Sequence, residues 1–141
     1  RRVGRQHWLR NLAGPRPRVL FWQNLRRITA ALGIIHAQGL VHGQLTADTI
    51  MTEGSDEPDF QLGGFEWSLW LNAGAPELTQ AKLGAVAAAL RSESYSFAQD
   101  WRALGLVALE CLHLEARASG EILPRRGSDA SINLQVPERV L

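Results

Sequence analysis

His36 and His42 are the residues of this sequence that would most readily begin a metal site, because imidazole is a common metal ligand. Side chains three or four positions apart share a helix face, whereas positions 36 and 42 do not. Cys111 is the only cysteine, so it forms no disulfide within the chain and belongs to no Cys/His set spaced for zinc. We therefore expect no metal site, and we expect a reducing compartment, the cytoplasm.

Acidic residues gather between positions 53 and 59, where they suggest a calcium loop. They are Glu53, Asp56, Glu57 and Asp59. Their spacing does not match the EF-hand pattern, and Gly, Ser and Pro, which favour turns, are interleaved with them. The sequence therefore predicts a solvated turn here.

Arginine is concentrated near the start of the sequence, although the net charge is only +1. The arginines that precede the first acidic residue, Asp48, are Arg1, Arg2, Arg5, Arg10, Arg16, Arg18, Arg26 and Arg27. Aromatic residues lie among them, and such a segment can grip phosphates and stack on bases. A nucleic-acid-binding module that uses Arg1, Arg2, Arg5 and Arg10 is therefore one alternative. The other interpretation is that these arginines lie on solvated helix faces or pair with acids elsewhere.

The length and composition predict one globular domain over residues 1–141. With 141 residues, 45% of them hydrophobic, the chain can bury a core, and global disorder is excluded. The longest run of low polarity, residues 83–90, is far shorter than the roughly 20 residues that span a bilayer. We expect no membrane association.

Several helices are predicted from the spacing of apolar residues. Residues 19–38 carry apolar side chains at three- and four-residue steps, with Gly39 placed to cap the helix end. A short helix is expected over 5–13 and an alanine-rich helix over 78–90. Residues 97–115 are apolar nearly all round, which predicts a helix buried on every side.

The remaining segments predict little regular structure apart from one hairpin. Residues 49–52 and 60–62 are short β-type runs separated by turn formers. Residues 120–136 contain glycine and proline and predict a loop.

Four stretches, in order along the chain, resemble the C-lobe of protein kinases. Residues 31–42 resemble the end of a long C-lobe helix, with its pattern A-L-x-x-L-H-x-x-G-L-V-H, and residues 42–50 occupy the place of the catalytic loop, H-R-D-L-x-x-x-N. Residues 62–66 lie where the D-F-G motif belongs, and residues 95–105 resemble the start of the buried central helix. The resemblance covers about residues 5–115 and implies a kinase-like C-lobe, mainly α with a small β-hairpin.

The positions that carry kinase chemistry hold other residues here. Gln44 replaces the catalytic-loop aspartate, and an amide cannot act as a general base near neutral pH. Thr49 replaces the loop asparagine and Gly64 replaces the D-F-G aspartate, so both magnesium ligands are lost. Gly43 and Thr46 stand at the arginine and lysine positions. The resemblance therefore implies that the protein is not an enzyme and takes no cofactor.

Other positions of the kinase pattern are retained. His42 and Phe65 match the two C-lobe residues that stack in the regulatory spine, and Asp100 matches the aspartate that tethers the catalytic loop. Met51 matches the residue that forms the floor under adenine. From the residues alone, His42 is expected to be a buried, hydrogen-bonded histidine and Met51 an ordinary core residue of the hairpin. Asp48 is expected to face solvent or to cap the turn.

The kinase N-lobe has no counterpart, because no Gly-rich loop and no paired strand lysine precede the first helix. We expect the chain to be part of a larger protein, without the N-lobe and the last C-lobe helices. The tripeptide Ala75-Pro76-Glu77 spells the kinase A-P-E motif but lies too far from the central helix, and we interpret it as a coincidence. Trp67 and Trp70 suggest that the activation segment folds down as a packed apolar piece.

These features predict a catalytically inactive kinase-like domain, a pseudokinase, that acts as a scaffold or allosteric regulator. Its partners would be proteins or other domains of the same chain. A metal-independent nucleotide sensor with Met51 under the adenine is one alternative, and the nucleic-acid-binding module is another. Catalysis by a remodelled site is disfavoured, because the loop offers no base.

Overall fold

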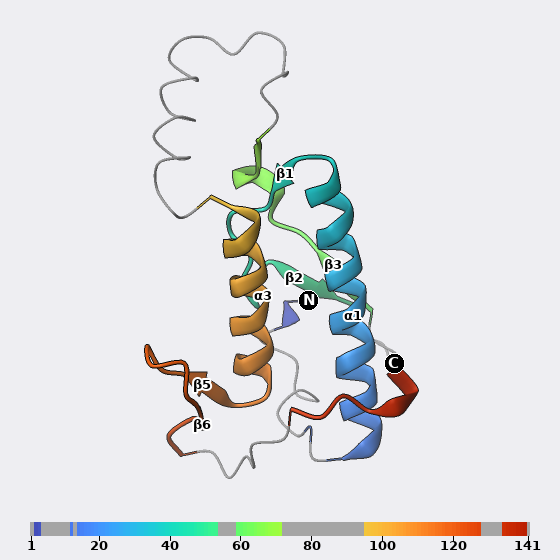
Figure 1. Ribbon diagram of the computed structural model, residues 1–141. Helices are drawn as coiled ribbons and strands as arrows, with labels where there is room; N and C mark the ends of the chain where they lie inside the picture. The colour runs from blue at the N-terminus through green and yellow to red at the C-terminus, as the bar shows by residue number, and fades with distance from the viewer. Residues whose placement is uncertain are drawn as a thin grey trace, which may run out of the picture.

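A computed structural model describes residues 2–3, 12, 14–53, 59–71, 95–127 and 134–140. Within these ranges two α-helices lie side by side, α1 (Pro15–Ala37) and α3 (Phe97–Cys111), accompanied by three two-stranded antiparallel sheets (Figure 1). Short 3₁₀ helices are η3 (Phe65–Trp67) and η4 (Glu138–Val140). The architecture is therefore a mixture of helices and small sheets.

Helix α1 confirms the helix predicted over 19–38, although it begins four residues earlier, at Pro15. Proline fits the first helical position, because its missing N–H would have no partner within the helix anyway. The helix ends as predicted: Gly39 adopts a φ of 83°, and its N–H donates to the carbonyl oxygen of His36 at 2.9 Å. One face of α1, carrying Phe21, Ile28 and Leu32, is buried in the core.

The predicted hairpin is confirmed as β2 (Ile50–Thr52) and β3 (Phe60–Leu62), which pair with Ile50 opposite Leu62. The hairpin packs on α1, where the Asn24 side chain accepts a hydrogen bond from the N–H of Phe60 at 2.8 Å. Strand side chains alternate between faces, so burial of Ile50 and Thr52 turns Met51 outward. The expectation that Met51 is a core residue is therefore wrong, because its side chain is 40% exposed.

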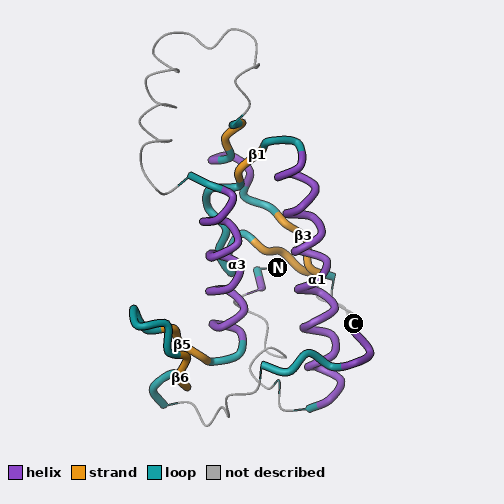
Figure 2. The backbone as a smooth tube through the Cα atoms, viewed as in Figure 1, coloured by secondary structure: helices purple, strands orange, loops and turns teal. Residues whose placement is uncertain are grey.

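Two further sheets were not predicted. Strand β1 (Leu40–Val41) pairs with β4 (Leu69–Trp70), and β5 (Leu114–Ala116) pairs with β6 (Ile122–Pro124). Figure 2 shows these strand pairs at opposite ends of α3. The expected loop over 120–136 is corrected by β6, and the helix expected to reach residue 115 ends at Cys111, because β5 begins shortly after it.

Burial of α3 is one-sided. The residues that face the core are Asp100, Leu104, Val107 and Cys111, which lie three or four positions apart. The prediction of a helix buried on every side is wrong for the part of the chain described, since Trp101 and Leu106 are exposed on the remaining surface.

Trp67 and Trp70 also correct an expectation. Their side chains are 57% and 53% exposed, so they do not form a packed apolar piece. Trp70 belongs to a two-residue strand in which Leu69 is the more buried residue, and the alternation of strand side chains therefore directs Trp70 to the surface.

Three predicted segments lie outside the described residues, namely most of the helix over 5–13, the turn over 54–58 and the helix over 78–90. In the ranges that are described, every helix is too short or too polar to cross a bilayer.

Candidate functional site

The loop at residues 42–49 is anchored to α3 by the buried carboxylate of Asp100. Its two oxygens accept hydrogen bonds from the backbone N–H groups of His42 (2.7 Å) and Gly43 (2.9 Å). Asp100 lies in the first turn of α3, which Ser96 caps by accepting a hydrogen bond from the N–H of Gln99 at 3.1 Å. The cap fixes the start of the helix, and the helix start places the carboxylate under the loop.

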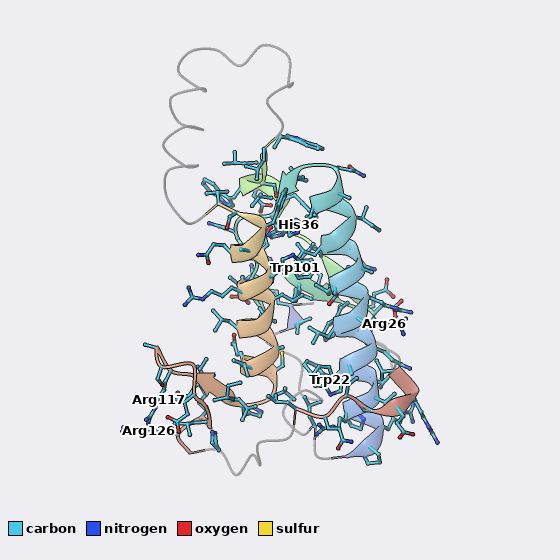
Figure 3. The ribbon with its side chains drawn as sticks, in the orientation of Figure 1. Trp22, Arg26, His36, Trp101, Arg117 and Arg126 are labelled. Atoms are coloured by element: carbon cyan, nitrogen blue, oxygen red, sulfur yellow. The ribbon has the colours of Figure 1, made fainter. Side chains whose placement is uncertain are left out.

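Sequence reasoning missed a third partner of Asp100. The Nε2 atom of His36 lies 2.8 Å from Asp100 Oδ2, and both side chains are almost fully buried. The His36 ring packs against Phe97 (4.5 Å between ring centroids) and Trp101 (5.3 Å), which places it between α1 and α3 (Figure 3). The available signal was the position of His36 in the last turn of the helix, four residues after Leu32 of the apolar stripe.

His42 joins the loop to the segment after the hairpin. Its ring is fully buried, as predicted, and Nε2 lies 2.7 Å from the carbonyl oxygen of Gly63. The ring centroid of Phe65 is 5.1 Å away in an edge-to-face arrangement, and Ser68 Oγ donates to the carbonyl oxygen of His42. His42, Phe65 and Asp100 are thus brought together by contacts on both sides of the loop.

Thr49 and Gly64 face each other. Gly64 has a φ of 78°, and a Cβ atom placed there would lie 2.7 Å from the Cγ2 atom of Thr49. The Thr49 hydroxyl is held by the backbone of Thr46, accepting from its N–H and donating to its carbonyl oxygen, each at 2.9 Å. The two positions therefore meet through a methyl group and a glycine, which offer a cation no ligand.

Asp48, the acidic residue next to Thr49, does not supply the missing metal ligand. Asp48 is exposed, as predicted, and its carboxylate lies 3.9 Å from Arg2 Nη1. In the described ranges, His, Cys, Asp and Glu side chains form no group of three that could hold a metal ion.

Gly43 is covered by an aromatic ring. Its φ is 80°, and a Cβ atom there would lie 2.3 Å from Cε1 of Tyr95. The Tyr95 hydroxyl donates to the carbonyl oxygen of Trp67 at 3.1 Å. Tyr95 thus lies across the loop and binds the segment that begins with η3, an arrangement that sequence reasoning did not anticipate.

Gln44 borders an open hollow of about 710 Å³. The lining residues are Gly43, Gln44, Leu45, Thr46, Gln99, Asp100 and Ala103. Apart from the Asp100 carboxylate, whose oxygens already accept hydrogen bonds, this lining offers amides, one hydroxyl and apolar groups. It can form hydrogen bonds with a ligand, but it presents no general base.

The other predicted residues are more scattered. Met51 is exposed on the hairpin and forms an isolated β-bridge with Arg2. Arg1, Arg5 and Arg10 lie outside the described residues. Cys111 is buried at the end of α3, and burial together with the nearby Glu110 raises the pKa of its thiol to about 12, which makes it a poor nucleophile.

Comparison with protein-family models, curated proteins and solved structures found no match.

Proposed function

We infer that this chain is a catalytically inactive domain with the fold of a protein-kinase C-lobe, which serves as a scaffold or allosteric regulator of protein partners in the cytoplasm. The observation that carries the proposal is the loop at residues 42–49. It is tethered by Asp100 and packed through His42. Yet Gln44 and Thr49 in the loop, and Gly64 facing Thr49, stand where a kinase needs acid–base and metal-binding groups.

Phosphoryl transfer depends on positioned carboxylates. One accepts the proton of the attacking hydroxyl, and others hold the magnesium ions that bridge the phosphates. Gln44 is exposed and cannot accept that proton, and the contact between Thr49 and Gly64 leaves no room for an acidic side chain. The absence of these groups argues against catalysis, and the ordered loop supports a binding role.

A scaffold also requires a surface for its partner. Trp67 and Trp70 are more than half exposed, and large aromatic side chains are the residues that most often dominate binding energy in interfaces. We propose that these tryptophans belong to the surface that engages the protein partner.

Thermal unfolding of the protein with ATP, with and without Mg²⁺, tests this function. A ligand at 100 times its Kd adds about 2.7 kcal/mol to the free energy of unfolding, which raises Tm by roughly 10 °C for a domain of this size. We expect no shift. A shift that requires Mg²⁺ would contradict the proposal, because it would require metal ligands that positions 49 and 64 do not supply.

A metal-independent nucleotide sensor is the second candidate. The observation in its favour is the exposed side chain of Met51, which is available to contact a flat base. In the same experiment this candidate predicts an equal Tm shift with and without Mg²⁺, abolished by Met51→Glu. The matched control is Leu106→Glu, which introduces the same charge at an exposed apolar position on α3.

A further inference from the structure

A second hollow, of about 530 Å³, lies against α1 and η4. Its charged or amide-bearing lining residues are Gln23, Asn24, Arg26, Arg27, Asp59 and Arg139. The lining thus carries three guanidinium groups and one carboxylate, and none of these residues belongs to the 42–49 loop. The hollow is therefore a basic site separate from the one that carries the proposed function.

The fold brings these arginines together from two segments. Gln23, Arg26 and Arg27 lie three and four positions apart, so they share one face of α1. Arg139 comes from η4, which is held against that face because Arg26 Nη1 donates to the carbonyl oxygen of Val140 at 2.7 Å. Figure 3 shows Arg26 on the side of α1 that η4 approaches.

The three guanidinium groups differ in what already engages them. Arg27 forms an ion pair with Asp59, and Arg26 uses one N–H on Val140 and keeps the rest of its five donors. Arg139 is exposed and makes no hydrogen bond or ion pair with the other described residues. The hollow therefore retains donors on Arg26 and Arg139 and an excess of two positive charges.

We propose that this hollow binds a phosphate group as a dianion, either inorganic phosphate or a phosphomonoester. Such a group carries a charge of about −2 near neutral pH, which matches the excess at the site, and its oxygens accept the parallel N–H donors of a guanidinium group. The Asp59 carboxylate disfavours a continuous phosphodiester backbone, because it would lie near neighbouring phosphates. The ligand is either free phosphate or a phosphorylated serine or threonine of a protein partner.

Calorimetric titration of the protein with inorganic phosphate, and separately with a phosphoserine peptide and its unphosphorylated form, tests the proposal. Saturable one-to-one binding of phosphate or of the phosphorylated peptide is expected. Equal affinities would identify free phosphate as the ligand, and tighter binding of the peptide would identify a phosphorylated partner.

The variant Arg139→Gln tests whether binding takes place in this hollow. It should weaken binding about tenfold or more, the usual effect of losing a charged hydrogen bond, without altering the circular dichroism spectrum. Arg102→Gln is the matched control, since it removes the same charge from an exposed position on α3. Absence of saturable binding would overturn the proposal. Equal weakening by both variants, or tighter binding of single-stranded DNA than of the phosphorylated peptide, would overturn it as well.

Discussion

The ring of Tyr95 lies directly over Gly43, so closely that a single methyl group on the glycine would come within 2.3 Å of the ring carbon Cε1. The same glycine has a left-handed backbone, with a φ of 80°. Two independent constraints therefore act on one position, and they can be separated by experiment.

Gly43→Ala should destabilise the protein for both reasons. The left-handed conformation costs about 1–2 kcal/mol for a residue with a Cβ atom. Crowding against the ring adds roughly 1–3 kcal/mol. Urea denaturation measures the sum. Gly120→Ala is the control, because Gly120 has a φ of 84° but no atom within 4 Å of the added Cβ. Equal losses in the two variants would show that Tyr95 does not crowd position 43.

Asp100→Asn should lower the free energy of unfolding by about 2–3 kcal/mol, since hydrogen bonds to a charged acceptor are among the stronger ones. The amide keeps one acceptor oxygen but presents an NH₂ group to the remaining donors. Chemical denaturation measures the loss. Asp48→Asn, at an exposed carboxylate whose ion pair is long, should change stability by less than about 0.5 kcal/mol. A loss at position 100 as small as that at position 48 would contradict the tether.

Gly64→Asp introduces the aspartate of the D-F-G pattern at this position, and we expect that it does not create magnesium binding. The added Cβ atom would lie 2.7 Å from the Thr49 methyl group, and the backbone there has a φ of 78°. We expect a loss of stability of at least about 1–2 kcal/mol from the backbone alone. Thermal unfolding of the variant should remain insensitive to ATP with Mg²⁺, and a Tm increase that depends on both would refute this expectation.

We expect the folded protein to lose stability at alkaline pH because of the buried thiol of Cys111. Burial is the main cause that raises its pKa from 9.0 to about 12, so the thiolate forms more readily in the unfolded chain than in the folded one. Its contribution is complete below pH 9 and declines as the pH rises from about 9 towards 12. Urea denaturation of the wild type and of Cys111→Ala at pH 7 and pH 10 measures this. The stability difference between them should be smaller at pH 10, and a constant difference would contradict the assignment.

The elements found by periodicity are those with enough residues to show a period. Helix α1 follows from its apolar spacing, and the β2–β3 hairpin follows from two β-type runs separated by turn formers, whereas β1 and β4 have two residues each and carry neither signal. Whether Trp101 is exposed depends on which segments pack against α3, and the residue types of the helix do not reveal those segments. The contact between His36 and Asp100 joins residues 64 positions apart, and it arises only once the two helices pack.

The Asp100 carboxylate accepts hydrogen bonds from the backbone N–H groups of His42 and Gly43 and also contacts the ring of His36. This sharing determines how the effects of substitutions combine. Once Asp100 is removed, replacing His36 breaks no further bond to that carboxylate. The free-energy changes at positions 36 and 100 should therefore not add, and the double variant should be more stable than the sum of the single losses implies. The two helices and the loop between them therefore share one stabilising group, the Asp100 carboxylate, and their contacts with it do not contribute independently to the free energy of unfolding.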